Sequence, residues 1–410
     1  MTFDPLLLAD LGRSVKSLND ELIEFRRDLH RHPELGRSET YTTAAVSARL
    51  REAGLEPSVL PLGTGLICDI PPGPRGAGAA GVHTAGNSAT PRLVALRADI
   101  DALPINDEKT VEYASTIPNV CHACGHDVHT AVVLGAGLAL REVSSTSGLP
   151  NRVRLIFQPA EELIPGGSLD VIAAGGIDGV DSIYAVHCDP KIEVGRLGLR
   201  AGPITSAADL VRVRVAGPGG HTARPHLTAD LVSALGMLIT QLPAVLSRRV
   251  DPRSGLSLVW GKVHAGAATN AIPQTGEVEG TMRVLDQDVW EVLPDLIPEL
   301  VKGLMSPYGV DAEVEVHRGV PPCVNDPQAI EQMQAAAEAI LGEQAVTGTD
   351  QSLGGEDFAW YLGRVQGALA RLGVRPPGHA AVTDLHRGNF DIDERAIEIG
   401  AGFLAVSAIT

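Results

Sequence analysis

The residues best suited to chemistry lie in a nine-residue stretch, CHACGHDVH, which runs from Cys121 to His129. The stretch holds two cysteines and three histidines, in a chain with 13 histidines in all. Thiolate sulfur and imidazole nitrogen are the donors that zinc and similar ions prefer in proteins. The stretch therefore indicates either metal chemistry or thiol chemistry.

Three interpretations of this stretch compete. Cys121 and Cys124 could form a redox dithiol, but such a pair should open a thioredoxin-like βαβ unit, and none is evident. They could be half of a structural zinc site, but the second Cys-x-x-Cys pair is missing. We favour a catalytic metal site in which Cys124 and His126 act together with distant ligands.

Polar residues that end apolar, strand-like runs could supply the distant ligands. VRLIFQPAEE ends in Glu161 and Glu162, SIYAVH ends in His187, and a further histidine would come from the C-terminal part of the chain. Neighbouring side chains diverge at a strand end. One of the two carboxylates can therefore bind metal while the other acts as a general base toward water.

The elements that would position these residues alternate between strands and helices over the first two hundred residues. Apolar spacing predicts helices over residues 18–30 and 42–53 and a third that starts at Asp127, its expected N-cap. The alternation predicts an α/β sheet covered on both faces, with ligands at the carboxyl ends of its strands. The Gly/Ala-rich segment 71–91, including His83, is predicted to be a surface loop without chemistry.

A different pattern runs from about residue 202 to residue 316. It reads as strand, helix, two strands, helix and strand, the β-α-β-β-α-β order of a ferredoxin-like module. We therefore predict an α/β catalytic domain formed by residues 1–201 and 317–410, with a ferredoxin-like α+β domain inserted at 202–316. The exposed edge of the inserted sheet would pair with its twin in a homodimer.

The composition excludes several classes of protein. A hydrophobic fraction of 44% and a charged fraction of 20% are typical of a folded chain. The net charge of −17 argues against a nucleic-acid partner. No run approaches the roughly 18 apolar residues of a membrane helix, and the start lacks a secretory signal, so we expect a cytoplasmic protein. The five scattered cysteines do not suggest a disulfide framework, and Cys68 and Cys323 are expected to be buried.

The chain resembles the M20 family of metallopeptidases and amidohydrolases, in the branch of hippurate hydrolases, N-acyl-amino-acid amidohydrolases and auxin-conjugate hydrolases. The matching stretches occur in family order over nearly the whole chain: RRDLHRHPELG, LRADIDALPI, HACGHDVHT, QPAEE, GPGGHTARPH, TNAIP, GTMR, GGEDF and DLHRGNFDID. The resemblance implies a zinc-exopeptidase-like catalytic domain with an inserted lid or dimerisation domain. It also implies hydrolysis of the amide bond of a small N-acyl amino acid or short peptide.

The resemblance further implies two divalent metal ions per subunit, with Zn, Mn, Co and Ni as candidates. Cys124 would bridge the two ions as a thiolate, and Glu161 would be the general base that moves the water proton to the leaving nitrogen. The remaining ligands would be His126, Glu162, His187 and His386.

Other matched positions imply supporting roles. Asp99 and Asp101 would orient metal ligands, although strand-end carboxylates that cap the next loop explain them equally well. His221 would stabilise the oxyanion, reaching across the dimer interface. The resemblance also places the substrate α-carboxylate on three positions of the second half of the chain: Asn270, Arg283 and Gly355.

Two alternatives and two departures stay open. The same scaffold could be a dipeptidase or an N-acetyl- or N-succinyl-diaminopimelate deacylase. It could also be a metal-binding homologue that has lost activity, although the full ligand set argues against this. Cys121 replaces a larger apolar residue of the family and could pair with Cys124 on oxidation, which predicts reversible inactivation by mild oxidants. The Arg-Gly-Asn-Phe segment after His386 also departs from the family pattern.

Overall fold

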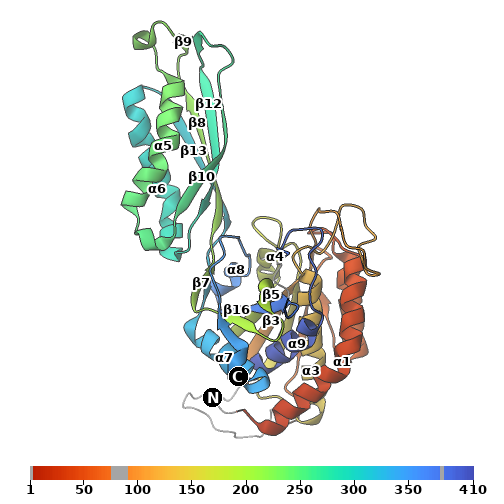
Figure 1. The fold of residues 1–410 in the computed structure, drawn as a ribbon. Helices are drawn as coiled ribbons and strands as arrows, with labels where there is room; N and C mark the ends of the chain where they lie inside the picture. The colour runs from red at the N-terminus through yellow and green to blue at the C-terminus, as the bar shows by residue number, and fades with distance from the viewer. Residues whose placement is uncertain (1–2, 75–90, 379–382) are drawn as a thin grey trace. The chain divides into compact units, whose positions relative to one another are not determined.

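The computed structural model describes residues 3–74, 91–378 and 383–410, and the chain forms two compact units (Figure 1). The first unit contains Met1–Gly202, Asn325–Asp350 and Trp360–Thr410, and the second contains Pro203–Val324 and Gln351–Ala359. Most of the predicted Gly/Ala-rich loop, including His83, lies outside the described residues.

The first unit is built on a mixed eight-stranded sheet with the strand order β1-β2-β4-β3-β5-β16-β6-β15. At its centre, β3 runs parallel to β4 and β5, and β5 runs parallel to β16. Every residue of β3 is buried, as expected for a parallel strand covered on both faces. In sheet order the strands are β1 (Ser58–Val59), β2 (Leu66–Ile70), β4 (Arg152–Gln158), β3 (Leu93–Asp99), β5 (Ser182–Glu193), β16 (Gln366–Arg375), β6 (Leu197–Leu199) and β15 (Val346–Gly348).

Helices of this unit pack on one another and on the sheet. α3 packs against α1, α9 and β3, and α7 packs against α9 and β16 (Figure 1). The helix α3 is buried over most of its length, which makes it a rigid support for residues at its N-terminus. The helices are α1 (Pro5–Arg31), α2 (Thr40–Glu52), α3 (His126–Thr146), α4 (Ser168–Ala173), α7 (Pro327–Leu341), α8 (Ala359–Leu362) and α9 (Arg395–Ser407).

Three details of the predicted elements are wrong. α1 begins at Pro5, well before residue 18, because Asp4 caps it by accepting a hydrogen bond from the Leu6 amide. Asp127 is not the N-cap of α3; that residue is Gly125, and Asp127 lies in the first helical turn. The strand β5 does not end at His187, because pairing with β16 continues it to Glu193.

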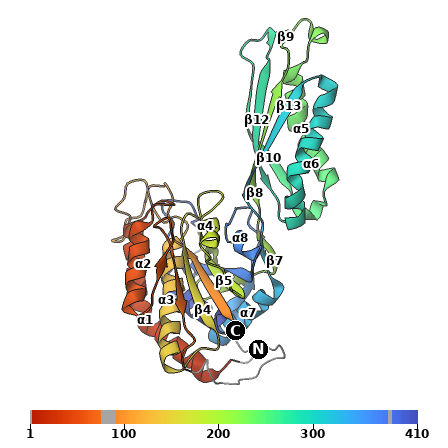
Figure 2. The ribbon, with the colours of Figure 1, turned by 180° about the vertical axis from the view of Figure 1, so that it is seen from behind.

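The second unit is a four-stranded antiparallel sheet with the order β10-β12-β8-β13, packed against two helices (Figure 2). Its elements follow the predicted β-α-β-β-α-β order: β8 (Ala208–Ala216), α5 (Leu231–Arg249), β10 (Ser257–Ala265), β12 (Thr275–Arg283), α6 (Gln287–Met305) and β13 (Asp311–Val320). Two short ribbons pair β9 (Gly220–His221) with β11 (Ala271–Ile272), and β7 (Gly202–Thr205) with β14 (Cys323–Asn325). The expected fold class, an α/β catalytic sheet with a separate antiparallel α+β unit, is confirmed.

The alternation along β8 explains how its sheet has one buried face. Val211, Val213 and Val215 are buried, whereas Arg212 and Arg214 point to the opposite face. There the two arginines form ion pairs with glutamates of β12 and β13. The sheet therefore has one apolar face for α5 and α6 and one charged face.

One described helix meets the criterion for a membrane span, contrary to the expectation from the sequence. α5 has 19 residues and a mean hydropathy of 1.4 over its most apolar window. Its residues Leu235, Leu238, Leu242 and Leu246 are buried, and the helix packs on β10 and β12. Because a helix that covers a sheet passes the same test, this is weak evidence for a membrane protein.

Candidate active site

Five predicted metal ligands lie together in the first unit. Cys124, His126 and His187 offer three ligand atoms within 4.8 Å of one another, and Cys124, Glu162 and His386 offer a second such group. The two groups share only the sulfur of Cys124. This is the arrangement that a thiolate bridging two ions requires.

His126 is held with one ring nitrogen open for a ligand bond. It begins α3 directly after Gly125, whose φ of +85° favours glycine and where a Cβ atom would lie 2.9 Å from the sulfur of Cys188. Its Nδ1–H donates to the backbone oxygen of Asp101 over 2.9 Å, so Nε2 is the nitrogen that can bind a metal ion, once it has lost its proton. Nε2 is buried and has no hydrogen-bond partner within the described residues.

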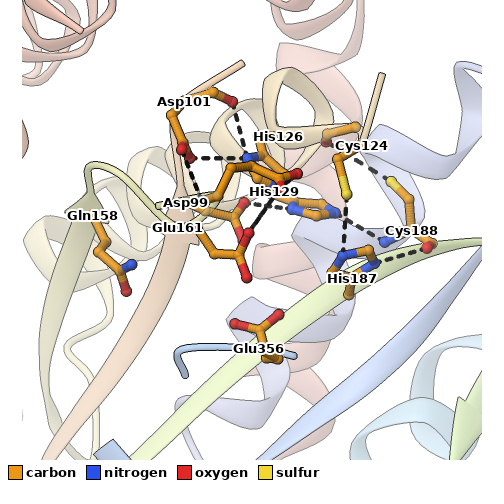
Figure 3. A network of polar contacts seen from close by, with 12 residues as sticks. Asp99, Asp101, Cys124, His126, His129, Gln158, Glu161, His187, Cys188 and Glu356 are labelled. Atoms are coloured by element: carbon orange, nitrogen blue, oxygen red, sulfur yellow. Dashed lines mark hydrogen bonds and ion pairs between the residues drawn. The ribbon is translucent and has the colours of Figure 1, made fainter. Parts of the chain in front are cut away.

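His187 is fixed in the same sense from β5 (Figure 3). Its Nδ1–H donates to the backbone oxygen of Cys188 over 2.9 Å, and its Nε2 lies 3.6 Å from the sulfur of Cys124. Burial, with the charge of Arg371 added, lowers the pKa of His187 well below its usual value. The ring is therefore neutral near pH 7, which is the form that binds metal.

Glu161 and Glu162 follow β4 and point into the cluster. Glu162 Oε1 lies 3.3 Å from His386 Nε2, and the Glu162 backbone amide donates to Asp101 Oδ2 over 3.0 Å. Glu161 Oε2 lies 3.9 Å from His126 Nε2, and 10% of its side chain is exposed. Both carboxylates lie in the cluster, and both belong to a candidate group with His126. The assignment of Glu162 as a ligand and of Glu161 as the general base remains a prediction.

The C-terminal histidine is brought in by a strained loop. His386 has a φ of +61°, which is uncommon for a residue with a side chain. Its amide donates to the backbone oxygen of Ala123 over 2.8 Å, and the Glu108 amide donates to Gly388 O over 2.9 Å. The first bond ties His386 to the residue before Cys124, and the second ties the Arg-Gly-Asn-Phe segment to the loop at Glu108. The hydrogen bond with Glu162 raises the pKa of His386.

His129, the third histidine of the stretch, had no role in the sequence interpretation. Its Nε2 accepts a hydrogen bond from the Cys188 amide over 2.9 Å, and its Nδ1–H donates to Asp99 Oδ1 over 2.6 Å. Asp99, His126 and His129 also form a group that could hold a metal ion. Since both of its nitrogens make hydrogen bonds, we infer that His129 supports the site. The spacing of three from His126 in a helix, which puts both rings on one face, was the signal that could have found it.

Asp99 and Asp101 lie behind the ligands, as the prediction of an orienting role requires. Asp101 receives the hydrogen bonds of His126 and of the Glu162 amide. Asp99 is fully buried, forms an ion pair with Arg97 over 2.6 Å and fixes the ring of His129. Their orienting roles remain predictions.

The electrostatics of the cluster suit a cation. Burial by itself would lower the pKa of His126, but Asp99 and Cys124 outweigh it and hold that pKa well above its usual value. Burial raises the pKa of the Cys124 thiol. A divalent ion would relieve the excess negative charge and keep Cys124 deprotonated. The sulfur, nitrogen and oxygen donors and the open Nε2 of His126 therefore fit a transition-metal ion.

Cys121 is fully buried, and burial raises the pKa of its thiol to about 11. Thiol oxidation proceeds through the thiolate and needs access to the oxidant. The structure therefore gives no support to rapid oxidation of Cys121, and inactivation by mild oxidants stays a prediction.

The other predicted residues lie in the second unit. His221 is exposed on β9 and pairs with Ala271 of β11, the residue that follows Asn270. His221 and Asn270 therefore belong to the same two-stranded ribbon. Arg283 ends β12 and donates to the backbone oxygen of Leu353 over 2.9 Å, in the segment that contains Gly355. The structure thus groups these residues in two pairs, and their roles in binding remain predictions.

A cluster of sulfur, nitrogen and carboxylate groups on an α/β sheet, with a further carboxylate close to it, is typical of a metal-dependent hydrolase. The sequence matches peptidase family M20/M25/M40 over residues 95–409, which is most of the chain. The chain belongs to this family, as the resemblance implied. Its expected enzyme class, an amidohydrolase of the M20 family, is confirmed as well.

Three similar proteins support this assignment. N-acetyl-L-cysteine deacetylase of Bacillus subtilis (strain 168) is 38% identical over 397 residues, 96% of this chain and 89% of that protein. The Rhodococcus jostii (strain RHA1) protein named "Putative glutamate--cysteine ligase 2-3" is 47% identical over 377 residues, 92% of this chain but only 45% of that protein. Bacillus subtilis YxeP, described as a dinuclear metal-binding peptidase from the M20 family, is structurally similar with a TM-score of 0.81 at 31% identity, covering 96% of this chain and 98% of YxeP.

Proposed function

We propose that this protein hydrolyses the amide bond of N-acyl amino acids and releases a carboxylic acid and a free amino acid. The observation that carries the proposal is the pair of ligand groups that share Cys124, with Glu161 beside them. The similarity to N-acetyl-L-cysteine deacetylase makes N-acetylcysteine the first substrate to test. We expect the reaction to take place in the cytoplasm.

The residues of the first unit divide the chemical work. Two divalent ions (Zn, Mn, Co or Ni), held by the five ligands, would polarise the scissile carbonyl and lower the pKa of water. Glu161 accepts the proton of the attacking water and delivers it to the leaving nitrogen. This delivery is needed because an unprotonated amine is a very poor leaving group. Asp101 holds the ring of His126 in place, and Asp99 holds the ring of His129 beside it.

The residues of the second unit supply substrate contacts in this proposal. Asn270, Arg283 and Gly355 hold the α-carboxylate of the amino acid, for which an arginine fork is suited. His221 donates to the oxyanion and does so from the second subunit of a homodimer.

Replacing His221 by alanine is expected to lower kcat by about 10²-fold to 10³-fold, the effect of losing one oxyanion donor. His226 is exposed on the same segment and gives the matched control, since His226→Ala should leave kcat unchanged. Sedimentation should show a dimer for the wild type and for both variants. A monomer with full activity would contradict the shared site.

Metal removal and resupply test the proposed function directly. We expect chelated protein to be inactive on N-acetylcysteine and on a panel of N-acyl amino acids, dipeptides and N-succinyl-diaminopimelate, followed by mass spectrometry. Resupply with Zn, Mn, Co or Ni should restore cleavage of the N-acyl amino acids. Preference for dipeptides or for the diaminopimelate compound would favour those alternatives. Absence of any cleavage with two ions bound per chain would point to a homologue that has lost activity.

A further inference from the structure

Glu39 is a buried carboxylate that no part of the proposed chemistry uses. It directly precedes α2, the usual place for a residue that caps its own helix, but its side chain makes no such bond. The side chain is instead fully buried, and Oε1 accepts a hydrogen bond from the backbone amide of Ala160 over 2.7 Å. Glu39 thus reaches a residue 121 positions away, directly before Glu161.

The backbone at Ala160 needs such a partner. Its φ is +54°, in the left-handed region that residues with a Cβ atom rarely occupy. Ala160 is fully buried, and the backbone amide of Gly167 donates to its carbonyl oxygen over 3.0 Å. This conformation turns the chain at the end of β4 and so determines where the two glutamates that follow can point.

Two carboxylates therefore hold the amides on either side of Glu161. Glu39 binds the amide of Ala160 over 2.7 Å, and Asp101 binds the amide of Glu162 over 3.0 Å. Burial raises the pKa of Glu39 to about 7, and an oxygen of a carboxyl group can accept the amide hydrogen bond in either protonation state. The peptide unit between Pro159 and Ala160 and the unit between Glu161 and Glu162 are thus each held by a carboxyl group.

Glu39 is itself held firmly by its surroundings. Its backbone oxygen accepts from the Thr43 hydroxyl over 2.5 Å, and that hydroxyl also accepts from the Gly65 amide over 2.8 Å. A Cβ atom at Gly65 would lie 2.5 Å from Cδ of Pro159, so the backbone at Gly65 packs directly on the residue before Ala160. Glu39, Thr43 and Gly65 therefore together support the turn at Ala160.

We propose that Glu39 is a positioning residue for the general base: its bond to the Ala160 amide holds the strained turn that aims Glu161 into the metal cluster. The proposal rests on the proposed function where activity is measured. Misplacing a catalytic group by about 1 Å can cost 10²-fold in rate. Glu39→Ala is therefore expected to lower kcat by about 10²-fold with little change in KM.

Two further variants separate positioning from general support. Glu39→Gln keeps an oxygen that can accept the Ala160 amide and should recover most of kcat. In the Glu39→Ala background, Ala160→Gly should recover part of kcat, because glycine adopts a positive φ without strain. A role limited to filling space in the core would give neither recovery.

Glu34→Ala is the matched control. Glu34 accepts hydrogen bonds from the amides of Tyr41 and Thr42 at the start of α2, at 2.8 Å and 2.9 Å, but does not bond to Ala160. This variant should lower thermal stability by a similar amount and leave kcat within about twofold of wild type, since it leaves the turn intact. An equal loss of kcat in Glu34→Ala and Glu39→Ala would overturn the proposal.

Hydrogen–deuterium exchange tests the same bond without any substrate. In Glu39→Ala the peptide that spans residues 158–163 should exchange at least about tenfold faster at the Ala160 amide, and in Glu34→Ala it should exchange as in the wild type. Unchanged exchange in Glu39→Ala would overturn the proposal. If the wild type cleaves no N-acyl amino acid, the proposed function fails, while the exchange result still decides the role of Glu39.

Discussion

Replacing Glu161 by glutamine is expected to lower kcat by about 10²-fold to 10⁴-fold, the range measured for loss of a general base. Glutamine has nearly the same shape, so the turn at Ala160 and the neighbouring ligand atoms should stay in place. It cannot accept the proton of the attacking water, however, and it cannot pass that proton to the leaving nitrogen. Rates on N-acetylcysteine, measured together with metal content, check this expectation.

Glu162→Gln is the matched control, because it makes the same change one residue later. Glu162 lies 3.3 Å from His386 in the second ligand group, whereas Glu161 stands beside the ligands. With the proposed roles of Glu162 as a ligand and Glu161 as the base, we expect Glu162→Gln to lower the metal content and Glu161→Gln to leave it unchanged. If the two effects were exchanged, the assignment of base and ligand would have to be reversed.

Replacing Arg26 by methionine is expected to lower the free energy of unfolding by about 3–5 kcal/mol, the cost of removing one member of a buried ion pair. Asp127 then keeps only its bond to His30. Arg26 and Asp127 are both buried, with Nε and Oδ2 2.7 Å apart. Burial alone would raise the pKa of Asp127, but Arg26 and His30 hold it well below its usual value. Asp127 therefore stabilises the fold at neutral pH, and this contribution is lost as the pH falls below about 4.

Denaturation by urea measures the loss of stability in Arg26→Met, and two other variants serve as comparisons. Adding Asp127→Asn to Arg26→Met removes the stranded charge, so the double variant should regain a large part of the loss. Arg13→Met breaks an ion pair with Asp10 in the same helix, where 73% of the arginine side chain is exposed. That change should cost less than about 1 kcal/mol. A loss of that small size in Arg26→Met would show that the buried pair contributes little.

The sequence predicted the elements well where the local pattern decides them. The alternation of Val211, Val213 and Val215 with arginines predicts β8, and the helical spacing of leucines that prove to be buried predicts α5. The start of α1 was missed although Asp4 and Pro5 are an ordinary helix start. The end of β5 could not be found locally, because the residues after His187 join the sheet only through pairing with β16.

The site followed the same division. Two cysteines and three histidines within residues 121–129 make that part of the site recognisable, and the resemblance to the M20 family supplied the rest of the ligand set. Glu39, His129 and Arg26 escaped notice because their partners lie elsewhere in the chain: Ala160, the Cys188 amide and Asp127. A single sequence does not show these pairings, because a glutamate before a helix looks the same in the sequence whether its side chain is buried or exposed to solvent.

The two ligand groups that share Cys124 differ in how far they are closed to solvent. His126 and His187 are buried on α3 and β5, whereas the side chain of His386 is 52% exposed on its loop. A bound ion leaves only when its ligands open, and exposed loops open more readily than packed helices and strands. For a centre that holds two ions as proposed, we therefore expect the ion next to His386 to leave first, which gives a form with a single ion. A measured metal content between one and two ions per chain would then mean that some molecules hold a single ion. It would not mean that the sample is a mixture of molecules with two ions and molecules with none.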